Sequence, residues 1–473
     1  MLAGGLSVAV GQEPVPSPVQ TSPATPDTTK PQQPSSQPTA QPGAGSQVQT
    51  GSVLGNAGSQ SLLSRLAALL NDHQYPDVEK MLDEADTSDN AGRLTPQQKQ
   101  LYRGILANRD NKPEESIKLL QPLLDKIKSD EHPPEEKMLR KALAEDYLRT
   151  GDWTAANQAY LELDYRLGGS MTPEERNEIE LPVKLLPLAI HNPPMTVESA
   201  GPFTLPYDRD FLGLADVPVF VDAESHDWMM DPTAPFNLIC RSTAKSVGLK
   251  ISEASATVHT ITGRPIQVHM TVIPRFTIGT VTLRNVTAFV FDDADYYFPQ
   301  SQYWVRGVLG YPAVSALGSV TVVTQTRIEV RPGDSEQRLK TGARFYLDGD
   351  RVVAALGKPG EERMYAVDAG GQQTYLTSRY YAEHSGDFDG KQIQLMAMPG
   401  TQKKPPAPAY VADAVTLSIG DRPVTLHYLQ VLTQPLNAAA IDDTYGTLGI
   451  DVLDEFQSYT FDYKTMRFGI KNE

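Results

Sequence analysis

The chain has 473 residues, with 42 Lys and Arg against 58 Asp and Glu, so its formal net charge is -16. At about 150 residues per domain, this length predicts roughly three folded units. An acidic chain without a Lys- or Arg-rich stripe is repelled by phosphate backbones, which argues against nucleic-acid binding. No apolar run approaches the ~18 residues of a membrane span, and the single Cys240 excludes an intramolecular disulfide framework and multi-thiolate metal sites.

The first 60 residues lack the large apolar side chains that a packed core requires. Residues 1–12 (MLAGGLSVAVGQ) are apolar and small, like the end of a signal peptide, although the basic leader is missing. Residues 13–60 are rich in Pro, Ser, Gln and Thr, which predicts a disordered, partly polyproline tether. We therefore expect an exported protein, periplasmic or extracellular. The alternative is an ordinary terminus on a cytoplasmic protein.

Residues 61–190 have the apolar periodicity of amphipathic helices. Segments such as 134–152 place apolar residues at i, i+3, i+4 and i+7. Pro96 and Pro113 stand at predicted first helical positions, and Gly151 stands where a helix is predicted to end. This part of the chain is therefore predicted to be an α-helical unit.

The helices recur in pairs. Small and aromatic residues in LAEDYLRTGDWTAANQAYLEL fall at the spacing of a helical repeat: Leu143, Ala144, Tyr147, Gly151, Trp153, Ala156, Tyr160 and Leu163. The segment resembles a tetratricopeptide repeat, and two weaker copies precede it, centred on Val78 and Ser116. Such a stack would offer a concave surface to a peptide or protein partner. The alternative is a helical spacer that packs on the following domain.

From about residue 200 onward, alternating β-branched segments predict strands. Three elements recur in the same order: an apolar strand ending in Asp, at 231 and 368; Ile-Gly, at 278 and 419; and apolar-Gly, after Val308 and Thr447. The offsets are 137, 141 and 139 residues, a coincidence that chance explains poorly. We therefore predict a tandem duplication, with a first copy at 200–335 and a second copy at 340–473.

The duplicated pattern resembles the retropepsin-like and pepsin-like aspartic peptidases, in particular bacterial single-chain members with two lobes. Asp231 and Asp368 match the catalytic positions of that family, and Val308-Leu309-Gly310 and Thr447-Leu448-Gly449 match its later apolar-Gly element. A hairpin with its tip near Gly263 resembles the flap that closes over substrate. The resemblance implies a multidomain α+β chain, in which a tetratricopeptide-like helical unit precedes a two-lobed all-β acid-protease fold.

The resemblance also implies a chemistry. One carboxylate of the pair Asp231 and Asp368 would take a proton from a bound water while the other protonates the peptide carbonyl. The same resemblance makes the following residues substrate-binding candidates: Thr233, Ala234, Gly263, Gly370 and Gly371. It implies a peptide or protein substrate and neither a metal nor a cofactor. Because one chain contains both lobes, a monomer would suffice.

The residues after each Asp depart from the family pattern. Pro232 and Ala369 stand where a Ser or Thr hydroxyl normally locks the two loops together, and Thr233 stands where Gly normally permits a tight turn. Two interpretations therefore stay open. The chain is either an aspartic endopeptidase with an Asp dyad, or a catalytically degenerate acid-protease fold that binds peptides or proteins together with the helical repeats.

Overall fold

The computed structural model describes residues 62–87, 94–128, 131, 133–199, 201–206, 208–209, 215–232, 234, 236–259, 265–298, 302–333, 338–349, 351–369, 373–396, 406–435 and 442–472. The predicted signal-peptide remnant and the predicted tether lie outside these residues. Within the ranges just given, no helix combines the length and the apolar character that crossing a bilayer requires.

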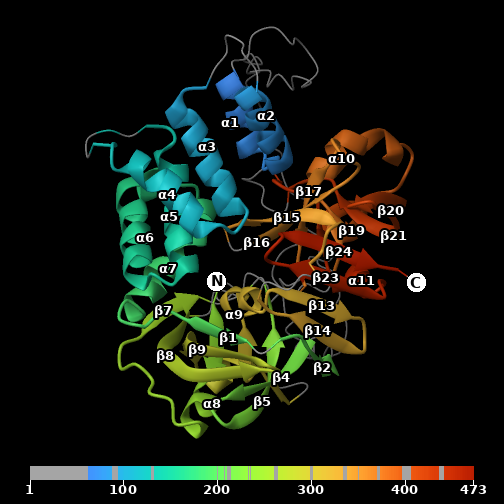
Figure 1. Cartoon of the computed structure of the whole chain (residues 1–473). Coiled ribbons are helices and arrows are strands. Elements are labelled where there is room, and N and C mark those ends of the chain that lie inside the picture. Colours follow the sequence, from blue (N-terminus) through green and yellow to red (C-terminus); the bar gives the residue numbers. More distant parts are fainter. Residues whose placement is uncertain are drawn as a thin grey trace, which may run out of the picture. The chain divides into compact units, whose positions relative to one another are not determined.

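The N-terminal part of the described chain is helical, as predicted (Figure 1). Its elements are α1 (Leu62–Asn71), α2 (Tyr75–Thr87), α3 (Pro96–Arg109), α4 (Pro113–Leu124), α5 (Glu136–Thr150), α6 (Trp153–Leu167), η1 (Gly168–Ser170), α7 (Pro173–Leu185) and η2 (Leu186–Leu188). Pro96 and Pro113 are the first residues of their helices. Gly151 ends α5 in the left-handed conformation, with φ of 73°, which favours glycine. The tetratricopeptide identity of these helices stays a prediction.

Strands fill the rest of the described chain. β1 (Thr196–Ser199) precedes the first copy, whose elements are β2 (Phe203–Pro206), β3 (Asp208–Arg209), β4 (Ala215–Val221), β5 (Glu224–Met230), β6 (Asn237–Cys240), α8 (Arg241–Ser246), β7 (Ala256–His259), β8 (Pro265–Ile278), β9 (Val281–Phe291), η3 (Asp293–Tyr296), β10 (Tyr297–Phe298), β11 (Tyr303–Trp304), β12 (Gly307–Leu309), α9 (Tyr311–Ala316), β13 (Ser319–Val323) and β14 (Arg327–Arg331). One sheet runs in the order β1-β9-β6-β12-β5-β4-β8-β7.

The second copy repeats this series. Its elements are β15 (Ala343–Asp348), β16 (Arg351–Leu356), β17 (Arg363–Val367), β18 (Tyr375–Leu376), α10 (Ser378–His384), η4 (Ser385–Phe388), β19 (Gln394–Met396), β20 (Ala407–Ile419), β21 (Arg422–Leu432), β22 (Gly446–Leu448), α11 (Ile450–Leu453), β23 (Ser458–Asp462) and β24 (Arg467–Lys471). A second sheet runs β19-β20-β21-β18-β22-β17-β16-β15-β24-β23-β13-β14-β2, so strands from both copies share it.

Strand pairing repeats between the copies residue by residue. In the first copy, Val308 of β12 lies opposite Met229 of the parallel strand β5. In the second, Thr447 of β22 lies opposite Ala366 of the parallel strand β17. These partners are displaced by the offsets of 139 and 137 residues that the sequence comparison identified. The duplication inferred from sequence is therefore present in the pairing of the backbone.

The two copies join through β13 and β23, which lie side by side and antiparallel (Figure 1). Thr321 faces Thr460, and these residues occupy equivalent positions 139 residues apart. Val320 faces Phe461. Their equivalents in the other copy, Tyr459 and Val322, also face each other. The register is thus unchanged when the copies are exchanged, as in a two-fold interface between identical subunits. The Thr321 and Thr460 hydroxyls are 2.8 Å apart at its centre.

The helices share hydrophobic cores with both copies. Leu181 and Leu185 of α7 pack in a buried cluster with residues of β8 and β9, including Val268. Residues of α1 to α3 pack with Tyr346 and Met364 of the second copy. The helical unit therefore buries apolar surface against both β copies.

Glu136, at the start of α5, connects two helices through buried charges. Its Oε1 accepts hydrogen bonds from Arg140 Nε at 2.6 Å and from Arg166 Nε at 2.5 Å. Burial alone would raise the pKa of Glu136, but the bonds from Arg166 and Arg140 lower it from 4.5 to about 2. Because the pKa is lower in the folded state, Glu136 stabilises the fold fully above pH 4.5 and progressively less toward pH 2.

We predict that Glu136→Gln lowers the free energy of unfolding near neutral pH. The difference between the wild type and this variant should shrink as the pH falls from 4.5 to about 2. Urea unfolding across this pH range measures it, with the exposed Glu115→Gln on α4 as the control. A difference that stays constant across the range would contradict the prediction.

Candidate active site

The backbone N–H groups of Asp231 and Asp368 make equivalent hydrogen bonds in the two copies. The Asp231 N–H, directly after β5, donates to Leu309 O of β12 at 3.0 Å. The Asp368 N–H, directly after β17, donates to Leu448 O of β22 at 2.9 Å. Each Asp therefore follows its strand at the level where the parallel partner strand reaches the Gly of the duplicated pattern, Gly310 or Gly449.

The residues directly after the two Asp residues, Pro232 and Ala369, lie near the junction of the copies. Pro232 and Ala369 both line one small cavity of about 20 Å³. Its other walls include Val320 and Val322 of β13 and Tyr459 of β23, the strands that pair across the junction. The residues next to the two candidate carboxylates are therefore brought together, although they are 137 positions apart in sequence.

The two carboxylates differ in exposure. Asp231 is only 1% exposed. Burial, together with the charges of Tyr311 and Asp231, raises the pKa of Tyr463 well above its ordinary range. Asp368 is half-buried and lines a cavity of about 260 Å³. Polar and charged residues form much of that cavity: Arg351, Tyr375, Thr377, Asp442, Asp443, Thr444 and Thr447.

At each strand end, a polar side chain accepts a hydrogen bond from the backbone N–H of the Gly. Asn237, six residues after Asp231, accepts a bond from the Gly310 N–H at 3.1 Å. Thr374, six residues after Asp368, accepts one from the Gly449 N–H at 2.8 Å. Sequence reasoning missed both residues. The signal that could have identified them is a polar residue at the same offset after each Asp.

The substrate-binding candidates lie partly outside the described residues. Thr233, Gly263, Gly370 and Gly371 fall outside them. Ala234 is 1% exposed, and its backbone is engaged, because its N–H donates to Asp231 O at 3.2 Å and its carbonyl accepts from the Tyr311 N–H at 2.7 Å.

The strands of the predicted flap form an antiparallel hairpin. Ala256 of β7 pairs with Val268 of β8, and Thr257 pairs with Gln267. The hairpin tip, with Gly263, belongs to the residues outside the described part of the chain. The flap function of this hairpin stays a prediction.

Among the described residues, His73, Asp348 and Asp443 offer ligand atoms within 4.8 Å of one another, close enough to hold a metal ion. Arg351 already balances the carboxylates, because its Nη2 lies 2.8 Å from Asp348 Oδ2 and 2.6 Å from Asp443 Oδ2. His73 Nδ1 lies 2.7 Å from the same Asp348 oxygen. We therefore interpret the cluster as an ion-pair network that joins the α1–α2 turn to the second copy.

We predict that Thr374→Val destabilises the second copy. Besides accepting from Gly449, the Thr374 hydroxyl donates to Asp451 Oδ1 at 2.6 Å, so its removal leaves the buried Gly449 N–H without this acceptor. The expected loss is about 1–3 kcal/mol of unfolding free energy. Urea unfolding measures it, and Thr374→Ser, which keeps the hydroxyl, is the matched control. Equal stability of the Val and Ser variants would refute the supporting role.

Comparison with known proteins identifies similarity over part of the chain. Residues 217–313, from β4 to α9, match a family described as Aspartyl protease, and this segment includes Asp231 and Gly310. A crystal structure of a retropepsin-like aspartic protease from Rickettsia conorii is 17% identical, covers 29% of this chain and 95% of its own, and superposes with a TM-score of 0.22. No curated protein matches the chain. The first copy therefore carries an aspartyl-protease-like segment.

Proposed function

We propose that the chain is an aspartic endopeptidase that uses Asp231 and Asp368 as its dyad. The main support is the equivalence of the two Asp loops, which leave paired strands in the same way and place Pro232 and Ala369 on one cavity. The aspartyl-protease-like segment includes the first of the two carboxylates. A dyad requires one carboxylate from each copy beside a shared water.

In the proposed reaction, one carboxylate removes a proton from a water molecule that attacks the peptide carbonyl. The other carboxylate donates a proton to the carbonyl oxygen, so that the negative charge does not accumulate there. The C–N bond of the resulting diol then breaks as its nitrogen takes up the proton removed from the water, which releases an amine and a carboxylic acid. One proton must therefore be shared by the pair, and activity should fall when rising pH removes it. An extended peptide under the β7–β8 hairpin is the proposed substrate.

A specific observation favours a second candidate, a peptide-binding protein without catalysis. Pro232 and Ala369 offer no hydroxyl to join the two loops, and Asp231 is almost fully buried. Under this alternative, the degenerate acid-protease fold and the helical repeats hold a peptide or protein partner. Export remains a further proposal and rests on residues 1–60 alone.

We predict that the full chain cleaves an unstructured protein in mild acid, and that Asp231→Asn and Asp368→Asn each reduce the rate about 10²–10⁴-fold. Peptide release, followed by mass spectrometry, measures the rate and the cleavage positions. Asp413→Asn is the control, because the Asp413 side chain is 80% exposed and its carboxylate forms an ion pair with Lys391 on the surface.

The outcomes separate the two candidates. Cleavage that is equal in all four proteins would show that another enzyme is responsible. Absence of cleavage, combined with saturable binding of the same substrate, would favour the binding protein. Loss of cleavage in only one Asp variant would contradict a symmetric dyad.

A further inference from the structure

A cavity of about 260 Å³ adjoins Asp368 in the second copy (the Asp368 cavity). Three of its lining residues belong to neighbouring strands, because Thr447 of β22 lies opposite Ala366 of β17 and opposite Tyr375 of β18. The alanine has a small side chain, and the other two residues carry hydroxyls. Since Asp368 itself lines the cavity, a peptide with its scissile carbonyl on this carboxylate would place an adjacent side chain there.

The equivalent positions of the first copy are filled with apolar side chains. Val308 of β12 lies opposite Met229 of β5 and opposite Leu238 of β6, the same pairing as in the second copy. These three residues are at most 2% exposed, and they pack in one buried cluster with Leu185 of α7. The second copy therefore differs from the first at this place, because its smaller and more polar residues border an open cavity.

The Asp368 cavity is rich in carboxylates. Asp442 and Asp443 line it together with Asp368, and Arg351 is the only basic residue among the described residues of its lining. Two carboxylates already share Arg351 Nη2, which lies 2.6 Å from Asp443 Oδ2 and 2.8 Å from Asp348 Oδ2. Burial alone would raise the pKa of Asp443, but Arg351 lowers it below its ordinary value, so this carboxylate stays ionised in mild acid. The cavity therefore keeps a negative charge.

Two oxygen atoms of the lining are available to a ligand. Asp442 accepts hydrogen bonds from the N–H and the hydroxyl of Ser378, at 2.9 and 2.6 Å, and both end on Oδ2. Thr444 is 6% exposed, and its carbonyl accepts a bond from the Thr377 hydroxyl at 2.6 Å. Among the described residues, Oδ1 of Asp442 and the Thr444 hydroxyl have no hydrogen-bond partner, and both oxygens retain accessible surface.

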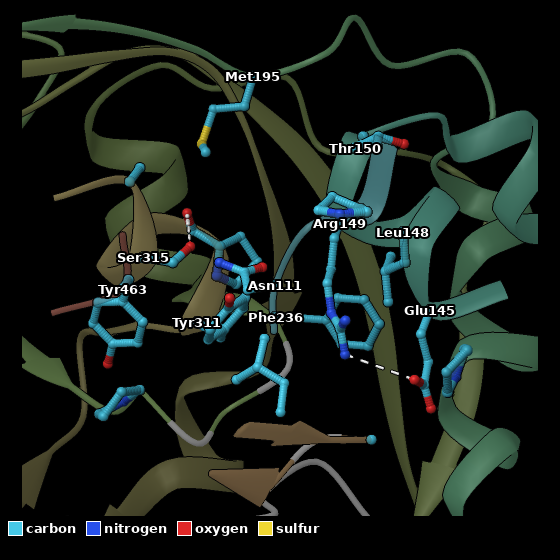
Figure 2. Close-up of a pocket in the computed structure, with 18 of the residues that line it drawn as sticks. Asn111, Glu145, Leu148, Arg149, Thr150, Met195, Phe236, Tyr311, Ser315 and Tyr463 are labelled. Carbon is cyan, nitrogen blue, oxygen red and sulfur yellow. Dashed lines mark hydrogen bonds and ion pairs between the residues drawn. The ribbon is translucent and has the colours of Figure 1, made fainter. Parts of the chain in front are cut away.

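The larger cavity next to the Asp368 cavity has a different balance of charge. Arg351 and Val352 line both cavities, and the larger one has a volume of about 790 Å³. Figure 2 shows Arg149 and Glu145 of α5 there, and Arg149 Nη2 lies 3.7 Å from Glu145 Oε2. Opposite charges thus face each other in the larger cavity, whereas no ion pair neutralises Asp442 within the described part of the chain.

We propose that the Asp368 cavity is a subsite for a basic side chain, Lys or Arg, next to the scissile bond of an extended peptide substrate. The cationic group would donate hydrogen bonds to Asp442 Oδ1 and to the Thr444 hydroxyl. Its alkyl part would lie against Val352 and Ala366. The position beside a scissile bond rests on the proposed function, whereas binding of a basic side chain can be measured without cleavage.

Peptide binding to the full-length Asp231→Asn variant tests the subsite without turnover. Fluorescence anisotropy compares three labelled nonapeptides of Ser, Thr and Val that carry Lys, norleucine or Glu at the central position. We expect the Lys peptide to bind roughly three- to thirtyfold more tightly than the norleucine peptide, the effect of a charge-assisted bond in a partly exposed site. The Glu peptide should bind most weakly, and a second substitution, Asp442→Asn, should remove most of the preference for Lys.

Two further variants complete the comparison. Asp413→Asn also removes one negative charge, but from a side chain that is 80% exposed, so it should leave the preference for Lys unchanged. Ala366→Met introduces the residue that the first copy has at the equivalent position, Met229. Filling the cavity in this way should abolish the preference while all carboxylates remain, and this variant decides the case if Asp442→Asn does not fold.

Digestion of an unstructured protein by the wild-type chain gives a second measurement, in which bonds next to Lys or Arg should be enriched among the cleaved positions and Asp442→Asn should lose this enrichment. A preference for Lys in binding without any cleavage would support the subsite and overturn the peptidase. Cleavage without enrichment, combined with equal binding of the Lys and norleucine peptides, would overturn the subsite and leave the peptidase. Absence of peptide binding, or a preference for Lys that survives both Asp442→Asn and Ala366→Met, would also overturn the subsite.

Discussion

The antiparallel pairing of β13 with β23 is the interaction on which the rest of the β region depends. It joins two copies whose described strands otherwise pair within their own copy. Because Thr321 faces Thr460 at equivalent positions, each copy presents the same surface to the other. This symmetry places Pro232 and Ala369 on a common cavity. The proximity of the residues that follow Asp231 and Asp368 therefore depends on a backbone register.

The helical unit contributes buried apolar residues to a hydrophobic cluster of each copy. Leu185 packs with the first copy, while Tyr346 and Met364 of the second copy pack among residues of the first helices. Ion pairs reinforce the second contact, including those of Arg344 with Glu79 and Asp110. These observations agree with the interpretation of the helices as a spacer that packs on the following domain.

Much of this arrangement could be predicted from sequence because it rests on local signals. The helix start at Pro96 follows from the fixed φ of proline, and the helix end at Gly151 follows from the access of glycine to positive φ. The duplication follows from the recurrence of Asp and apolar-Gly elements. The support of Gly310 by Asn237 and of Gly449 by Thr374 could not be predicted in the same way. Asn and Thr differ in chemistry, and only their hydrogen bonds identify them as equivalents. The meeting of Pro232 with Ala369 likewise depends on tertiary pairing.

The shared sheet also has a consequence for how the chain folds. During synthesis, β13 and β14 emerge more than a hundred residues before β23, their partner across the junction. Until then β13 presents an unpaired edge with alternating Val320 and Val322, the kind of surface that recruits other strands. Pairing of β13 with β23 brings together residues that are far apart in sequence, and such contacts form slowly. Nascent chains interrupted before residue 458 should therefore be the species most prone to aggregate, because they expose a template that the finished protein conceals.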